Sequence, residues 1–253
     1  MSNYITFSRL GSYGHLGNQL FQFSIVYSYA KQKNKTIAFT IDKQNSMLFK
    51  CFNLDCNISF TNSLMTTSSY VEKQFSYDEG IWNKNFDDLI GYFQSEKYFK
   101  QYTNELRQTL KFKNKSEELK DSVFIHVRRG DYLKYPDVHP LCSEEYYSTA
   151  IEIIRNKYGS NVKFVVFSDD INAAVEYNCF KQNNITFSNN DAFSTLYKMK
   201  SCMSGIIANS SFSWWGAWLI DNTNKTIIAP NRWFGSKGPK DTSDIYCSEW
   251  IKI

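Results

Sequence analysis

Short apolar runs alternate with amphipathic stretches through the second half of the chain. The runs are SVFIHV (122–127), VKFVVF (162–167), ITF (185–187), GIIA (205–208) and TIIA (226–229). Apolar residues recur at helical spacing between them, in 143–158, 170–177, 191–202 and 212–219. Alternating buried strands and helices predict an α/β fold built on a doubly wound parallel sheet.

The first half begins with a similar unit. Residues 3–8 and 36–41 are predicted as strands, and a loop with glycines at 11, 14 and 17 leads into a helix over 18–35. The pattern over 43–90 is too weak to assign elements. The densely charged segment 111–121 indicates either a boundary or an exposed helix. We therefore expect two domains, 1–115 and 116–253, each of ordinary domain size.

Polar side chains follow three of the predicted strands in the second half. Ligands of parallel sheets bind at the carboxyl ends of the strands, so these side chains are candidates for one binding rim. They are His126, Arg128 and Arg129 after the first strand, Ser168, Asp169 and Asp170 after the second, and Asn209, Ser210 and Ser211 after the fourth.

Each of these groups has a ligand-binding and a structural interpretation. The Arg128 fork could grip two phosphate oxygens, or it could pair with Asp131. Ser210 and Ser211 begin a helix, where free N–H groups and the helix dipole favour phosphate, although a serine N-cap explains part of the pattern. Three tryptophans in that helix are expected to pack in the core.

Asp169 and Asp170 also begin a predicted helix. An acidic N-cap is the simpler explanation, and the alternative is a carboxylate that accepts hydrogen bonds from guanine. In the first half, the loop before Asn18 and Gln19 matches no phosphate-binding fingerprint, but it allows close backbone approach beside two amide side chains. A tight turn without a ligand is the alternative there.

Composition narrows the class of protein. The net charge is +4, and Lys and Arg are dispersed without an RNP, zinc or helix-turn-helix pattern, which argues against a nucleic-acid-binding protein. Neither a signal peptide nor an apolar run long enough to span a membrane is apparent. The six cysteines lack CxxC spacing, so we expect reduced thiols in a cytoplasmic protein, with peripheral membrane contact left open.

Taken together, the segments resemble the α-1,2-fucosyltransferases of glycosyltransferase family 11. The matching stretches are GHLGNQLFQ (14–22), GYFQSEKYF (91–99), HVRRGDY (126–132), FSDD (167–170), ANSSFSWWGAWL (208–219) and PNRWF (230–234). They occur in the family's order and cover nearly the whole chain. A catalytically inactive sugar-binding module remains the alternative within this resemblance.

The resemblance implies a GT-B-like protein with two Rossmann-like halves, in which the second half binds GDP-fucose and the first faces an oligosaccharide or polysaccharide acceptor. It implies metal-independent, inverting transfer without a cofactor. Arg128 would hold the diphosphate, and His126 with Asp169 or Asp170 would lie near guanosine. Ser210, Ser211 and Phe212 would line the phosphate end, with Ser168 and Asn209 beside them, and Asn18, flanked by Gly17 and Gln19, would reach the donor from the first half.

The expected mechanism follows from charge. Negative charge develops on GDP as the bond to fucose breaks, and Arg128 with the helix after Ser211 would stabilise it. Inversion requires the acceptor hydroxyl to lose a proton, for which Asp131 is the candidate base and His126 its competitor. A purely structural Asp131, paired with an arginine, is the alternative.

Overall fold

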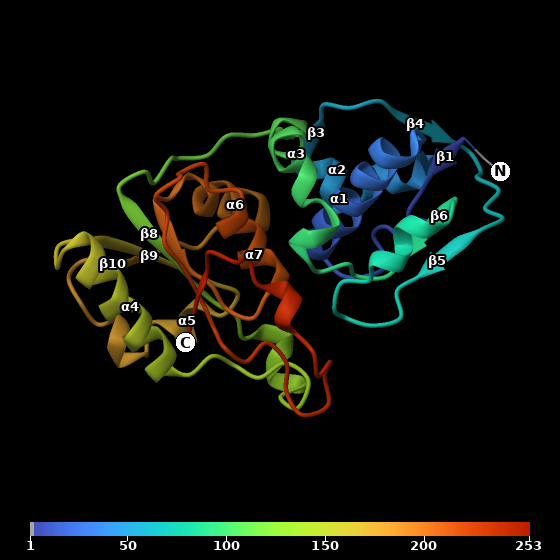
Figure 1. Ribbon diagram of the computed structural model, residues 1–253. Helices are drawn as coiled ribbons and strands as arrows, with labels where there is room; N and C mark the ends of the chain where they lie inside the picture. Colours follow the sequence, from blue (N-terminus) through green and yellow to red (C-terminus); the bar gives the residue numbers. More distant parts are fainter. Residues whose placement is uncertain (1–2) are drawn as a thin grey trace. The chain divides into compact units, whose positions relative to one another are not determined.

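The computed structural model describes residues 3–253, which form two compact units (Figure 1). The first contains the chain up to Asn114 together with Asp241–Tyr246, and the second contains Lys115–Lys240 and Cys247–Ile253. The sequence placed all of 116–253 in the second domain, whereas the fold groups 241–246 with the first unit. The acceptor and donor roles of the two domains remain predictions.

A six-stranded parallel sheet forms the centre of the second unit. Its spatial order is β10 (Ile185–Phe187), β9 (Lys163–Ser168), β8 (Ser122–Val127), β11 (Ser204–Ile206), β12 (Ile227–Ala229) and β13 (Ile251–Lys252). The predicted parallel sheet is confirmed, and β13 is an addition that the sequence did not indicate. This order is the one found in doubly wound dinucleotide-binding sheets.

Helices connect these strands: α4 (Glu144–Tyr158), α5 (Ile171–Ala174), α6 (Ala192–Ser201) and α7 (Ser211–Trp218). The alternate residues Val123, Ile125 and Val127 of β8 share one core cluster with apolar side chains of α4. The ring of His126, between them in sequence, instead contacts Phe212 of α7. The two faces of the sheet are therefore covered by different helices, as strand alternation requires.

Two predicted helices differ from the structure. The helix expected over 170–177 is limited to the four residues of α5, after which the chain enters the 3-10 turn Asn178–Phe180. The segment 113–121 contains no helix, and the preceding residues Leu110–Phe112 form strand β7. The interpretation of 111–121 as an exposed helix is therefore wrong.

The first unit also contains a parallel sheet. Strands β1 (Tyr4–Ile5), β2 (Thr36–Thr40) and β4 (Ile58–Thr61) pair in that order, and β5 (Ser69–Val71) pairs with β6 (Asp88–Ile90). A parallel bridge between Thr6 and Asp88 joins β1 to β6. The short antiparallel pair β3 (Phe52–Leu54) and β7 lies outside this sheet.

The remaining helices of the first unit are α1, α2 and α3, with several 3-10 turns. Their bounds are α1 Leu16–Lys33, α2 Met47–Cys51 and α3 Thr103–Thr109. The 3-10 turns are η1 Ile41–Asn45, η2 Glu79–Asn83, η3 Glu96–Tyr98, η4 Lys100–Tyr102 and η7 Ser243–Ile245, and the second unit has η5 Gly130–Lys134 and η6 Asn178–Phe180. Helix α1 is buried on nearly every side, which explains its weak amphipathic pattern.

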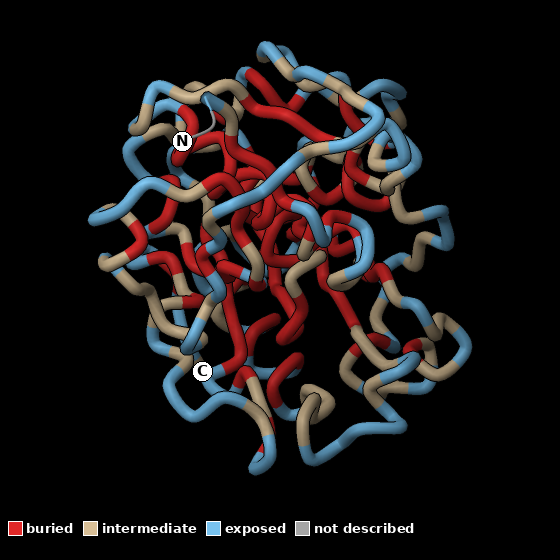
Figure 2. The backbone as a smooth tube through the Cα atoms, turned by 90° about the vertical axis from the view of Figure 1, so that its right-hand side faces the viewer, coloured by how far each residue is buried: buried red, intermediate tan, exposed pale blue. Residues whose placement is uncertain are grey.

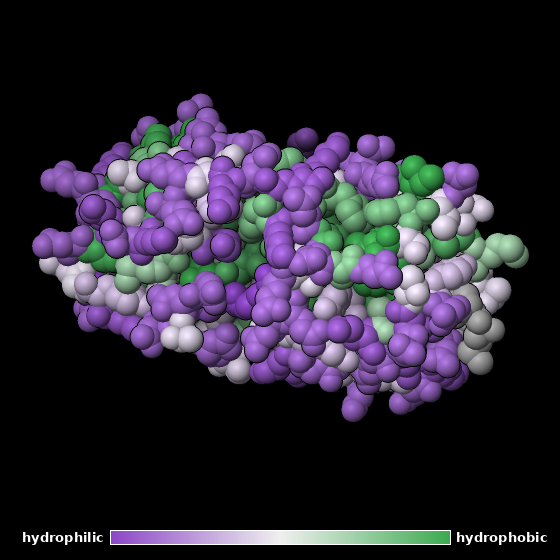
Figure 3. All heavy atoms as spheres, turned by 90° about the horizontal axis from the view of Figure 1, so that it is seen from above, coloured by the Kyte–Doolittle hydropathy of each residue, from purple (hydrophilic) through white to green (hydrophobic). Residues whose placement is uncertain are grey.

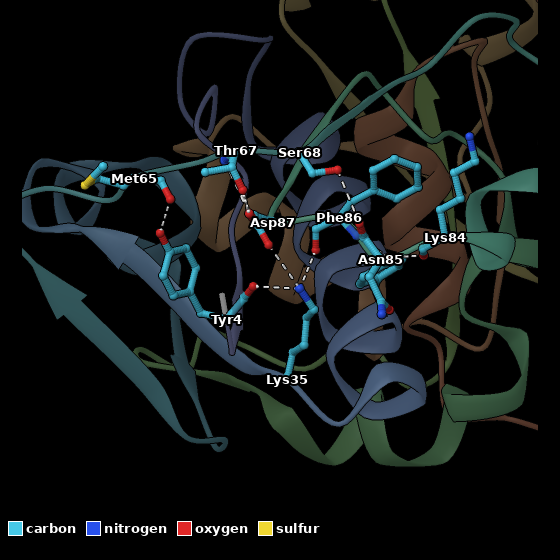
Figure 4. Close-up of polar contacts among 10 residues, drawn as sticks. Tyr4, Lys35, Met65, Thr67, Ser68, Lys84, Asn85, Phe86 and Asp87 are labelled. Carbon is cyan, nitrogen blue, oxygen red and sulfur yellow. Dashed lines mark hydrogen bonds and ion pairs between the residues drawn. The ribbon is translucent and has the colours of Figure 1, made fainter. Parts of the chain in front are cut away.

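A buried ion pair in the first unit joins the segments that precede β2 and β6 (Figure 4). Lys35 Nζ lies 3.2 Å from Asp87 Oδ1 and donates to the carbonyl oxygens of Tyr4 and Phe86. Asp87 in turn accepts a hydrogen bond from the Thr67 hydroxyl at 2.8 Å. Both charged side chains are at most 6% exposed, so each depends on its partners for compensation.

Burial follows the sheets and the helices that cover them, while the loops are exposed (Figure 2). Hydrophilic side chains occupy most of the face seen in Figure 3, with smaller apolar areas between them. Among residues 3–253, none of the helices combines the length and the apolar character needed to cross a bilayer.

Candidate functional site

The strand order of the second unit has a reversal point between β8 and β11. The chain proceeds from β8 outward to β9 and β10, then returns to the other side of β8 to form β11. Ile125 pairs with Ile206 across this point, so Arg128 and Asn209 each follow the pair by three residues. Ligands of open α/β sheets bind in the crevice at such a reversal. The three strand ends expected to form a rim are adjacent in the sheet.

Arg128 is held between two carboxylates at the end of β8. Its Nη1 lies 2.8 Å from Asp169 Oδ2, and its Nη2 lies 2.5 Å from Asp131 Oδ1. The guanidinium also lies over the Tyr132 ring, 5.1 Å from its centroid. Asp131 is 54% exposed and therefore bound weakly, so a ligand with two anionic oxygens could replace it on the fork.

Arg129 has a structural role instead. Its Nε donates to Asp170 Oδ2 at 3.2 Å, and its Nη1 donates to the Tyr177 hydroxyl at 2.9 Å. Its backbone N–H donates to Asp169 Oδ1 at 2.9 Å. Asp169 thus contacts both arginines that follow β8. It pairs with the side chain of Arg128 and accepts a hydrogen bond from the backbone of Arg129.

The glycine after the two arginines is required by this packing. A Cβ atom at Gly130 would lie 2.3 Å from Asp169 Oδ2, closer than any real contact. Any other residue would displace the carboxylate that orients Arg128. The turn predicted from the sequence therefore serves to bring two loops together.

The two aspartates that follow β9 have different roles: Asp170 caps a helix, and Asp169 pairs with Arg128. Asp170 is the N-cap of α5, where its Oδ1 accepts from Ala173 N at 3.2 Å. Its own N–H donates to Ser168 Oγ at 3.0 Å. Asp169 caps no helix and points to the β8 loop. The simple capping interpretation is confirmed for Asp170 alone.

His126 lies beneath this rim. It is 4% exposed, its ring centroid is 5.8 Å from that of Phe212, and its Nδ1 has no hydrogen-bond partner among the described residues. Burial, followed by the nearby charge of Arg128, lowers the pKa of His126 to about 3. The ring is therefore neutral at physiological pH and a poor proton acceptor.

Asn209 is occupied by structural contacts. Its Nδ2 donates to the carbonyl oxygens of Pro140 and Trp233, at 2.9 Å each. The backbone carbonyl oxygen of Asn209 accepts a hydrogen bond from the Tyr132 hydroxyl at 2.9 Å. The residue thus ties three loops together beside Arg128. Sequence reasoning missed Tyr132, because an aromatic residue in a loop gave no signal of this contact.

The N-terminus of α7 lies directly after this position. Ser210 is the N-cap, and its Oγ accepts from Phe212 N at 3.3 Å. Ser211 and Phe212 are partly exposed, while Trp214, Trp215 and Trp218 are buried, which confirms that the tryptophans pack. The first turn of a helix leaves N–H groups without intrahelical partners, so this end favours an anion.

The candidate residues of the first half lie in the other unit. Asn18 Oδ1 accepts from Gln94 Nε2 at 2.7 Å, next to Gly17 in the first turn of α1. Gln19 is 3% exposed, its Oε1 accepts from Leu48 N, and its Nε2 donates to the carbonyl of Gly14. The structure thus places the second-half candidates at adjacent strand ends of one sheet, and it places the first-half candidates around the first turn of α1.

No group of three or more His, Cys, Asp or Glu side chains suited to a metal ion occurs in the described part of the chain. The positive groups at the rim are a guanidinium and a helix N-terminus. These groups can compensate an anionic ligand by themselves.

Comparisons with known proteins show the family of the chain and its fold. The sequence model of glycosyl transferase family 11 matches residues 6–253. An alpha-1,2-colitosyltransferase of Escherichia coli is 28% identical over 95% of this chain and 96% of its own length. The crystal structure of NodZ alpha-1,6-fucosyltransferase soaked with GDP-fucose superposes with a TM-score of 0.53 at 12% identity, covering 87% of this chain and 93% of that one.

A second similar solved structure is that of POFUT1 in complex with GDP-fucose. It superposes with a TM-score of 0.51 at 12% identity, over 98% of this chain and 97% of that chain. At such identities the likeness concerns the fold, and it confirms the predicted GT-B-like architecture with two α/β halves.

Proposed function

Because the chain belongs to glycosyl transferase family 11, we propose that it transfers L-fucose from GDP-fucose to O2 of an acceptor galactoside, forming an α-1,2 linkage. Membership of this family shows that the protein is a glycosyltransferase. The α-1,2 linkage is supported by the name of the colitosyltransferase to which it is similar, and the donor by the GDP-fucose in the NodZ structure.

The observation that carries the proposal is the position of Arg128 at the reversal point of the sheet. The guanidinium follows β8, and the N-terminus of α7 follows the neighbouring strand β11. Two positively polarised groups of this kind suit a diphosphate, whose charge increases as the glycosidic bond breaks. Ser210, Ser211 and Phe212 would lie at the phosphate end.

Asp169 and His126 are proposed to face the guanosine part of the donor. The Asp169 carboxylate already accepts two donors, and a carboxylate of this kind matches the N1 and N2 donors of guanine. Buried, neutral His126 has an unpaired Nδ1 that could accept or donate one further hydrogen bond. Neither interaction needs a metal ion, and we propose metal-independent, inverting transfer without a cofactor.

Asp131 is the proposed proton acceptor for the acceptor hydroxyl. It is more exposed than any other charged group that contacts Arg128, and a diphosphate bound to the arginine would release it. His126 is less suited, since burial lowers its pKa to about 3. The role of Asp131 as a purely structural partner of Arg128 is the alternative that the experiment below separates.

The test is an incubation with GDP-fucose and a panel of galactosides, followed by linkage analysis of the product. An α-1,2-fucosylated galactoside is expected. A colitose nucleotide is tested as a second donor, because the similar Escherichia coli protein is an alpha-1,2-colitosyltransferase. Binding of GDP-fucose without any product would support an inactive sugar-binding module and overturn the proposal.

The catalytic assignment is tested with Asp131→Asn. If Asp131 is the base, the variant keeps its affinity for GDP-fucose and loses about 10²- to 10⁴-fold in turnover, the usual effect of removing an acid–base group. A purely structural Asp131 predicts turnover close to that of the unchanged protein.

Salt-dependent RNA binding without GDP binding would instead favour a nucleic-acid-binding protein.

A further inference from the structure

The parallel strands of the first unit continue from β2 through β1 to β6 and β5. Strand β1 lies between β2 on one side and β6 on the other, through the Thr6 to Asp88 bridge. The carboxyl ends of β5 and β6 are adjacent, and they lead directly into Glu72 and Gly91. Parallel sheets bind ligands at such an edge.

Glu72 follows β5, the strand beyond β6, at this carboxyl edge of the sheet. Its Oε2 accepts from Tyr92 N at 2.6 Å, and its Oε1 accepts from Phe93 N at 3.0 Å. A Cβ atom at Gly91 would lie 2.4 Å from the Cβ of Glu72, so a side chain there would exclude the glutamate. The segment after β6 is therefore shaped around one carboxylate.

The backbone of this segment is strained at one point. Phe93 has a φ of 52°, in the left-handed region that a bulky residue rarely adopts. The ring is fully buried and packs edge-on against Phe7 and Tyr98, which holds the conformation in place. Such outliers persist where the surrounding structure over-determines them, and they gather at ligand-binding sites.

An exposed aromatic ring lies beside the carboxylate. Tyr92, whose N–H binds Glu72, is 43% exposed. One face of its ring stacks on Tyr13, with centroids 5.7 Å apart and planes 25° apart. The stacking fixes the orientation of the ring and leaves part of it to solvent. An aromatic face beside a hydrogen-bonding carboxylate is suited to a sugar, which presents C–H groups and hydroxyls together.

A purely structural role explains the carboxylate less well. Nearby turns satisfy their backbone N–H groups with N-cap side chains, such as Ser95 Oγ on Lys97 N and Asp78 Oδ1 on Gly80 N. Glu72 is different, since burial raises its pKa to about 7 despite the two backbone hydrogen bonds. Holding a turn alone does not require a carboxylate in so unfavourable a place.

We propose that Glu72 and the exposed ring of Tyr92 bind the acceptor sugar. The carboxylate accepts a hydrogen bond from a sugar hydroxyl, and the ring covers an apolar face of the sugar. The inference rests on the proposed function, and it assigns the substrate class as a neutral hexopyranoside such as a galactoside. The donor-binding residues of the second unit are not part of this site.

The test compares Glu72→Gln and Tyr92→Ala with one control, Glu79→Gln, at an exposed residue of η2. Loss of a hydrogen bond to a charged group, or of the stacking ring, is expected to raise the acceptor KM by about 10- to 100-fold. The Kd for GDP-fucose and the donor hydrolysis rate are expected to stay within about twofold, as are all constants of the Glu79→Gln control.

Direct binding separates this inference from the proposed function. Saturation-transfer NMR with methyl β-galactoside reports sugar contact whether or not transfer occurs, so a protein without transferase activity still decides the site. Loss of the NMR signal in Tyr92→Ala supports the site. An unchanged signal and an unchanged acceptor KM in folded Tyr92→Ala overturn it, even if Glu72→Gln proves too unstable to purify.

Discussion

The Arg128 guanidinium lies 2.8 Å from the carboxylate of Asp169, which joins the ends of β8 and β9 through one ion pair. Asp169 also accepts the backbone N–H of Arg129, so the carboxylate orients the whole loop after β8. The arginine proposed to bind the diphosphate is therefore positioned before any ligand arrives. Preorganised charge of this kind is the largest single contribution in many transferase and hydrolase sites.

Replacing Arg128 by Lys should impair the proposed reaction although the charge remains. Lysine cannot present a planar fork to two phosphate oxygens, and the expected loss of turnover is about 10²- to 10³-fold. Kinetics with saturating galactoside measure the effect. Arg155→Lys is the control, because Arg155 donates to Gln182 and Asn184 at the far end of α4. Equal turnover in both variants would remove Arg128 from the diphosphate site.

Gly130→Ala should damage the site more than the fold. The new Cβ would lie 2.3 Å from Asp169 Oδ2, so the carboxylate must move and Arg128 loses its fixed partner. We expect a weaker Kd for GDP-fucose, measured by calorimetry. The matched control is Gly159→Ala, which has a φ of 93° and open space around the Cβ. It should lower the melting temperature and leave the Kd unchanged.

The buried pair Lys35–Asp87 should dominate the stability of the first unit. Lys35→Met removes the cation beside the buried Asp87 carboxylate, and the expected loss of unfolding free energy is about 3–5 kcal/mol. Denaturant titration measures it. In the control Lys31→Met, the lost pair with Glu105 is nearly half exposed, and the expected change is at most about 1 kcal/mol. Similar values for the two variants would contradict the role of the buried pair.

Glu72 should make stability depend on pH. Its folded pKa, about 7, lies above the ordinary value of 4.5, so the folded state favours the protonated form. The contribution to the unfolding free energy is therefore present below pH 4.5 and is lost as the pH rises toward 7. Tyr70 and Tyr98 also interact electrostatically with Glu72, and burial raises the pKa of both phenols, so they stay neutral in this range.

The measurement is the difference in unfolding free energy between the unchanged protein and Glu72→Gln, from pH 4 to pH 8. The glutamine has no charge to bury, so the unchanged protein should lose stability relative to the variant as the pH rises. A difference that does not vary with pH would show that the folded Glu72 titrates like an ordinary glutamate.

Most of the second unit was predictable because its strands are buried on both faces and read as continuous apolar runs. Strand β13 escaped because it has only two residues, both exposed. The region 43–90 could not be assigned for a related reason. Its strands β4, β5 and β6 have three or four residues each, and they are stabilised by partners distant in sequence.

The sequence predicted which strand ends lie together at the candidate site. It did not predict which contacts each side chain makes there. Arg128 and the α7 N-terminus follow from local sequence, since a strand end and an N-cap serine are local features. Asn209 was expected to face a ligand, yet its amide holds the loops at Pro140 and Trp233. Such a contact depends on residues that lie far away along the chain. Glu72 gave no signal for the same reason.

The chain enters the first unit again over 241–246 before it returns to the second unit, and this limits where the protein can be cut into its two units. Asp244, in the returning segment 241–246, accepts the backbone N–H of Tyr77 at 2.9 Å and pairs with Lys97, while the residues just beyond it form β13 of the other sheet. A fragment that stops at Asn114 would lack those anchors. Chimaeras that exchange acceptor specificity between relatives would therefore need three junctions, near 114, 240 and 246, to transplant the first unit intact.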